Sequence, residues 1–120
     1  MEILKYVGLV LFAVPFVLSG IAHVTARDAM AGYAQFKRIP MPMTSVVLSG
    51  IVLIVAPLLV IFGIIPQIAL AVLALFLLVT AFVMHNFWTV EDAQVKQGEQ
   101  INFNKNIGLA GACLVLLVLL

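Results

Sequence analysis

Long apolar segments alternate along the chain with short polar connections. The apolar segments occupy residues 3–24, 44–63, 67–88 and 103–120. Each is about 20 residues long, and at a rise of about 1.5 Å per residue such a helix crosses the roughly 30 Å hydrocarbon core of a bilayer. The pattern therefore predicts an all-α fold, an integral membrane antiparallel four-helix bundle.

The first connection, residues 25–43, is expected to hold a short helix at the membrane surface. Apolar positions in it, such as Tyr33 and Ala34, can face lipid or the bundle. Its charged residues are expected to stay in water: Arg27, Asp28, Lys37 and Arg38. Pro40 and Pro42 then hold the backbone extended, because proline restricts its own φ and the conformation of the residue before it.

The other two connections differ in length. The second is tight, since Gly63 suits the end of one helix and Pro66 the first turn of the next. The second and third spanning helices are therefore expected to form an antiparallel hairpin. The third connection, residues 89–103, is polar, and Gly98 is expected to break any helix in it. No internal repeat or linker appears, which predicts a single domain over residues 1–120.

Composition supports a membrane location and excludes several classes of function. The chain is 65% hydrophobic and only 9% charged, whereas a soluble domain has about 25% charged residues. The formal net charge of +1 and the lack of a basic patch with interleaved aromatics give no reason to expect a nucleic-acid partner. Cys113 is the only cysteine, which excludes an internal disulfide and a Cys-x-x-Cys redox pair. No ligand spacing indicates a metal site.

The distribution of basic residues predicts how the chain is oriented. Lys5 lies alone near the N-terminus. The other basic residues lie on the side of the two polar connections: Arg27, Lys37, Arg38, Lys96 and Lys105. Because short cytoplasmic loops carry an excess of Lys and Arg, residues 25–43 and 89–103 are predicted to be cytoplasmic. Both termini are then outside, in a multi-pass protein of the cell (inner) membrane.

Polar side chains of three spanning helices are expected at one end of the bundle. His23 lies near the end of the first helix and His85 near the end of the third, and these helices run in the same direction. The last helix begins at that end with polar residues, among them Asn104. Ionisable residues in membrane helices are costly and tend to face the protein interior, so a cleft is expected there. The candidate ligand-binding residues are His23, Arg27, His85, Asn86, Trp88, Asp92, Lys105 and Asn106.

Several interpretations of this cluster remain open. In the simplest, His85 and Trp88 are anchors at the membrane–water boundary, where tryptophan is enriched. In a second, the cleft binds a quinone or another amphiphile, and His23 or His85 donates a hydrogen bond to a carbonyl oxygen. Trp88 would then stack on the ring, and Asp92 would accept a proton. In a third, His23 and His85 ligate a b-type haem, although two histidines are too few to be a signature; in a fourth, the cluster binds another protein or a lipid.

Three short motifs follow one another at the helix ends. GIAHV closes the first helix, HNFWT closes the third, and NFNKNIGLAGACLVLL begins the last. Their order and spacing resemble the DoxX family, small membrane proteins of four predicted helices. The family pattern is a His-x-Phe-Trp element and then a Phe-x-Lys-Asn element before a glycine-bearing helix. It falls here on His85, Phe87 and Trp88, then on Phe103, Lys105, Asn106, Gly108 and Gly111.

The chain departs from the family pattern in its second helix. Many relatives carry a glutamate there before a glycine-rich run, whereas SGIVLIVAPLLVIFG has no carboxylate. This departure counts against any mechanism that needs a buried acid in the second helix.

The resemblance implies a role in membrane redox chemistry. Family members are linked to membrane redox assemblies, including a thiosulfate:quinone oxidoreductase subunit and partners of detoxifying enzymes. We therefore expect an accessory subunit of a membrane redox or quinone-linked system rather than an enzyme on its own. Its expected partners are the lipid bilayer, a membrane or soluble redox protein, and other copies of itself. The alternative is a non-catalytic assembly or chaperone-like factor whose loops bind a partner protein.

Overall fold

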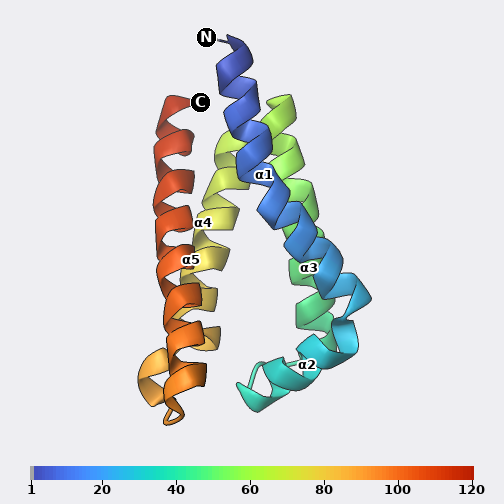
Figure 1. Cartoon of the computed structure of the whole chain (residues 1–120). Helices are drawn as coiled ribbons and strands as arrows, with labels where there is room; N and C mark the ends of the chain where they lie inside the picture. The colour runs from blue at the N-terminus through green and yellow to red at the C-terminus, as the bar shows by residue number, and fades with distance from the viewer. Residues whose placement is uncertain (1) are drawn as a thin grey trace. The chain divides into compact units, whose positions relative to one another are not determined.

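The computed structural model of the chain describes residues 2–120, and they are helical throughout except at short connections (Figure 1). The elements are α1 (Glu2–Thr25), α2 (Arg27–Phe36), α3 (Pro42–Phe62), α4 (Pro66–Met84), the 3-10 turn η1 (Phe87–Thr89) and α5 (Ala93–Leu119). Helices α1, α3, α5 and the segment from α4 through η1 are long and apolar enough to cross a membrane. The predicted all-α class and its four spanning segments are confirmed, as is the short helix between the first two.

The largest difference from the prediction lies between the last two spanning segments. Helix α4 ends at Met84, and α5 begins at Ala93 rather than at residue 103. The prediction that residues 89–103 form a loop is therefore wrong. Gly98 does not break α5. A Cβ added there would meet nothing within 4 Å, so the packing does not require a glycine, and its low helix propensity destabilises the helix by about 1 kcal/mol.

An N-terminal cap explains why α5 begins so early. Asp92 Oδ1 accepts hydrogen bonds from the backbone N–H groups of Gln94 and Val95, both at 3.0 Å. Asp92 itself has an extended backbone, with φ −67° and ψ 122°. Such a carboxylate satisfies donors that the first turn of a helix leaves without partners, and it interacts favourably with the helix dipole.

The chain divides into two compact units, one up to Ala69 and the other from Leu70 to Leu120. In the first unit, α1 and α3 approach most closely where two glycines face each other. A Cβ added to Gly20 would lie 2.6 Å from the carbonyl oxygen of Gly50, and one added to Gly50 would lie 2.7 Å from the Cβ of His23. Membrane helices associate through small residues of this kind, because lipid provides no hydrophobic force between them.

A helix contact and a tight connection complete the first unit. Helix α2 packs on α3, and its buried residues Ala31 and Ala34 lie three positions apart on one face. At the other end, α3 stops at Gly63, which adopts φ +70°, and α4 begins with Pro66. Glycine is the residue that tolerates this left-handed backbone, so the predicted tight connection is confirmed.

The second unit is a helical hairpin made by α4 from Leu70 onward, η1 and α5 (Figure 1). Small residues are buried on both helices, including Ala81 on α4 and Ala110 and Cys113 on α5. On α5, Asn106 is buried together with Ala110 and Cys113. These positions follow a spacing of three and four residues, which places them on one face of the helix.

Enlarging Gly20 tests the packing of α1 on α3. Gly20→Ala is expected to destabilise the first unit by about 1–3 kcal/mol, because the added methyl group collides with backbone that cannot move away. Gly8→Ala is the matched control, since a Cβ at Gly8 meets nothing within 4 Å. Unfolding in mixed micelles titrated with SDS measures the stability of both variants. Equal stability of the two variants would contradict this packing.

Substitutions at Asp92 test the cap. Asp92→Ala is expected to destabilise the start of α5 by about 1 kcal/mol, whereas Asp92→Asn retains a capping oxygen and is expected to cost only a few tenths. Amide hydrogen exchange over residues 93–99 measures the effect. Faster exchange in the alanine variant alone supports the cap, and no change in either variant would exclude it.

Candidate functional site

The end of α4 brings His85 against Glu99 of α5. The Nδ1 atom of His85 lies 3.3 Å from a carboxylate oxygen of Glu99. The side chains are only 20% and 12% exposed, respectively. The pair forms because the chain leaves the helix after Met84, so that His85 lies in the turn, while α5 extends back far enough to carry Glu99 beside it.

Four aromatic rings lie next to this pair along the chain and in space. We call Phe82, Phe87, Trp88 and Phe103 the aromatic cluster. Phe103 of α5 is its centre, with ring centroids 5.2 Å from Phe82, 5.5 Å from Phe87 and 5.7 Å from Trp88. Nearly perpendicular edge-to-face contacts of this kind are favourable between aromatic rings. The cluster therefore fastens η1 and the end of α4 to α5 and fixes the turn that contains His85.

Glu99, Phe103 and Asn106 follow one another on α5 at intervals of four and three residues, so they share one face of the helix. Asn106 is 7% exposed and is the only buried polar side chain among the described residues. Lys105 is exposed beside it. Burial of an amide in a membrane span is costly unless it finds a hydrogen-bond partner, which marks this face of α5 as unusual.

Two other predicted site residues have local structural roles. The carbonyl oxygen of Asn86 accepts hydrogen bonds from the backbone N–H of Thr89 at 3.1 Å and from its hydroxyl at 2.9 Å. These bonds close the turn of η1. Asp92 caps α5, as described above, and its carboxylate oxygen is occupied by that role.

His23 and Arg27 belong to the first unit, and each bonds to its own helix end. His23 Nδ1 donates to the carbonyl oxygen of Ser19 at 2.7 Å. Arg27 Nη1 donates to the carbonyl oxygen of Val24 at 3.1 Å. Both interactions satisfy carbonyl groups of the last turns of α1. The prediction that these two residues converge with His85 stays a prediction.

Glu99 is the residue that the sequence analysis missed. The glycine and several charged residues that precede the apolar part of the last helix are typical of a loop. A signal was present: Glu99 stands seven residues before Asn106 and four before Phe103, which is the spacing of one helical face. Extending the helix back to Ala93 would have placed the acid beside the predicted site.

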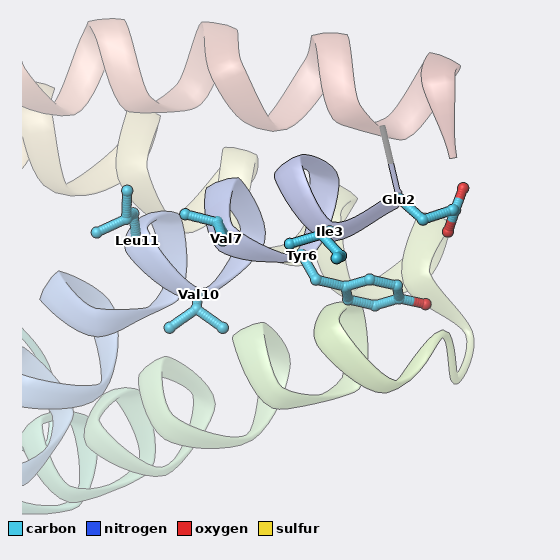
Figure 2. Close-up of a pocket in the computed structure, with 6 residues that line it drawn as sticks. All are labelled: Glu2, Ile3, Tyr6, Val7, Val10 and Leu11. Atoms are coloured by element: carbon cyan, nitrogen blue, oxygen red, sulfur yellow. The ribbon is translucent and has the colours of Figure 1, made fainter.

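A separate hollow lies at the other end of α1, away from His23. It is lined by apolar side chains of the first three turns together with Glu2 (Figure 2). The lining residues are Glu2, Ile3, Tyr6, Val7, Val10 and Leu11. All come from one helix, and the larger ones are exposed. Such a surface on a spanning helix suits contact with acyl chains, and it offers no group for chemistry beyond the Glu2 carboxylate and the Tyr6 hydroxyl.

Comparison with known proteins agrees with this architecture. The DoxX family model matches residues 7–86, a stretch that begins within α1, continues through α4 and ends just after His85. Glu99 and Phe103 lie beyond it. The inner membrane protein YphA of Escherichia coli (strain K12) is 31% identical over 104 residues, which cover 86% of this chain and 73% of that protein. No solved structure matches the chain.

The family match covers well over half of the chain, and the match to the relative, which is an inner membrane protein, covers most of both chains. With four spanning segments in the structure, the predicted location in the inner membrane is confirmed, whereas the orientation of the termini stays a prediction. The chain belongs to the DoxX family.

Proposed function

We propose that this DoxX protein binds the head group of a quinone, or of a similar amphiphile, as an accessory subunit of a membrane redox system. The observation that carries the proposal is the contact between His85 and Glu99, 3.3 Å apart, largely buried and beside the aromatic cluster. Imidazole beside carboxylate is a combination that can accept and return a proton. Ionisable residues in membrane segments mark ligand and proton sites more often than packing.

The depth of the pair suits a lipid-soluble ligand with a polar head. Helix α5 has 27 residues, which correspond to about 40 Å at a rise of about 1.5 Å per residue, roughly 10 Å more than the hydrocarbon core. Glu99 lies near the N-terminal end of this helix and is therefore expected close to the level of the lipid head groups. An amphiphile can place its polar ring there and leave its tail among the acyl chains.

The hydrogen bond also sets which nitrogen of His85 is available. An ionised carboxylate can only accept hydrogen bonds, so Nδ1 must donate to Glu99. In the neutral ring Nε2 is then an acceptor, and it has no hydrogen-bond partner among residues 2–120. A hydroxyl group of a reduced quinone fits this acceptor directly. A hydrogen bond from His85 to a quinone carbonyl oxygen, the interaction expected from the sequence, would instead require the imidazolium form, in which both ring nitrogens donate.

Neighbouring residues would orient the ligand. Trp88 is 51% exposed although three of its neighbours are rings of the aromatic cluster, so its free surface can stack on a quinone ring. Asn106, on the same face of α5 as Glu99, would offer an amide donor and acceptor. These residues can bind a head group and hold a proton; the electrons would pass to a partner protein of the redox system.

His85→Ala is expected to abolish retention of the ligand, because it removes the acceptor Nε2 and leaves Glu99 without its imidazole partner. Protein purified in mild detergent without added cofactor is extracted, and the extract is analysed for quinones by mass spectrometry. The wild-type protein is expected to retain quinone near one equivalent. Lys96→Gln, an exposed change on the first turn of α5, is the control and is expected to retain the same amount.

Other results would count against the proposal. If wild-type protein carries only bulk lipid and binds no added quinone, the redox role fails. If His85→Ala is silent while changes at Lys37, Arg38 or Lys96 prevent capture of a partner protein, the assembly-factor alternative is the better description.

Glu99→Gln is expected to change which form of the ligand is preferred. The amide can accept from Nδ1 or donate to it, so the His85 ring is no longer held with Nε2 as an acceptor. We expect affinity for a soluble quinol analogue to fall roughly fivefold, the difference between a charge-assisted and a neutral hydrogen bond, and affinity for the matching quinone to fall less. Tryptophan fluorescence of Trp88, the only tryptophan, can follow both titrations. Equal losses for the two forms would contradict the assigned tautomer.

A further inference from the structure

A second surface of the molecule carries basic and aromatic side chains together. It consists of α2 and the turn that follows it, residues 37–41. Helix α2 joins the end of α1 to the start of α3. Both of these helices are long and apolar enough to span a membrane, so α2 lies at the membrane surface.

The side chains of α2 fall into three groups around its axis. Ala31 and Ala34 are buried, and the helix packs on α3. Asp28 and Gln35 lie seven positions apart on one flank and are exposed, as expected of a face toward water. Tyr33 and Phe36 lie on the remaining flank. They are 40% and 76% exposed although they are large and aromatic, which water would disfavour and a lipid boundary would not.

The two rings form a stacked pair with a cation beside it. The centroids of Tyr33 and Phe36 are 6.3 Å apart, and the planes differ by 24°. The Nζ atom of Lys37 lies 5.6 Å from the centroid of Tyr33. Aromatic rings at the level of the head groups, with an ammonium group over one of them, are typical of segments that rest on a bilayer.

The residue after Lys37 adds a second positive charge in an uncommon backbone conformation. Arg38 has φ +63°, and its N–H donates to the carbonyl oxygen of Gln35, which ends the helix. Glycine adopts this left-handed conformation without strain, whereas other residues adopt it rarely. The Arg38 side chain is exposed, so the turn after α2 presents its guanidinium group at the surface.

We infer that the α2 surface, with Tyr33, Phe36, Lys37 and Arg38, binds the phosphate head group of an anionic phospholipid. The basic charges at this end of the first unit are Arg27, Lys37 and Arg38, and Asp28 is the only acid among residues 25–43. This local excess of positive charge is complementary to anionic lipid, and the exposed rings provide the apolar anchor that a soluble anion would not need.

The test measures lipid retention by native mass spectrometry. Delipidated protein in mild detergent is mixed with equal amounts of phosphatidylglycerol and phosphatidylcholine. The wild-type protein is expected to retain phosphatidylglycerol preferentially. Lys37→Gln combined with Arg38→Gln is expected to weaken phosphatidylglycerol binding roughly 30-fold, at the usual contribution of each basic residue near a membrane surface, and to leave phosphatidylcholine binding unchanged.

Two further variants keep the result interpretable. Lys5→Gln combined with Lys96→Gln makes the same change in net charge elsewhere and is expected to leave the preference intact. Arg38→Gly fits the left-handed backbone without strain, so it is expected to fold at least as well as the wild type while binding phosphatidylglycerol about fivefold more weakly.

Three outcomes would overturn the inference. The wild-type protein could show no preference for the anionic lipid. The control pair at Lys5 and Lys96 could lose the preference as fully as the pair at Lys37 and Arg38. Finally, inorganic phosphate alone could bind the wild-type protein and displace phosphatidylglycerol at comparable concentration, which would identify a soluble anion rather than a lipid head group as the ligand.

Discussion

The rest of the structure depends on one constraint, the absence of water in the hydrocarbon core. A backbone N–H or C=O group without a partner costs several kcal/mol there, so each crossing segment must be a helix that bonds to itself. The same constraint confines polar side chains to helix ends or to contacts with one another. It accounts for the absence of charged side chains from α3 and α4, and for the positions of His85 in the turn after α4 and of Glu99 near the start of α5.

With no hydrophobic force between helices in lipid, packing must come from close approach and from specific contacts. Each unit uses a different kind of contact. In the first, Gly20 and Gly50 let the backbones of α1 and α3 come together. In the second, the rings of the aromatic cluster hold η1 and the end of α4 against α5. The second arrangement has a consequence for function, because the turn that it fixes is the one that carries His85.

The acid in the candidate site comes from an unexpected helix. Relatives in the DoxX family commonly carry a glutamate in the second spanning helix, and this chain has none there. Glu99 places a carboxylate beside His85 from α5 instead, at a position outside the stretch that the family model matches. The proposed quinone site therefore combines a histidine from the family-matched part with an acid from the last helix. The lipid-binding surface inferred on α2 rests on different residues.

The sequence by itself determined the all-α class, the spanning helices and the short surface helix. Apolar length is a local signal, and so are Gly63, which ends α3, and Pro66, which begins α4. It also singled out His85, Trp88 and Asn106, because polar side chains stand out in an apolar chain. Two features were decided only by tertiary structure. The apolar pattern runs through Phe87 and Trp88, so it could not show that the chain turns at His85 to pack these rings on Phe103. The polar residues before Phe103 are typical of a loop, and only the Asp92 cap and the contact with His85 show that Glu99 is helical and largely covered. Periodicity reports which residues can share a face, whereas the partner of that face is set by contacts between segments distant in the chain.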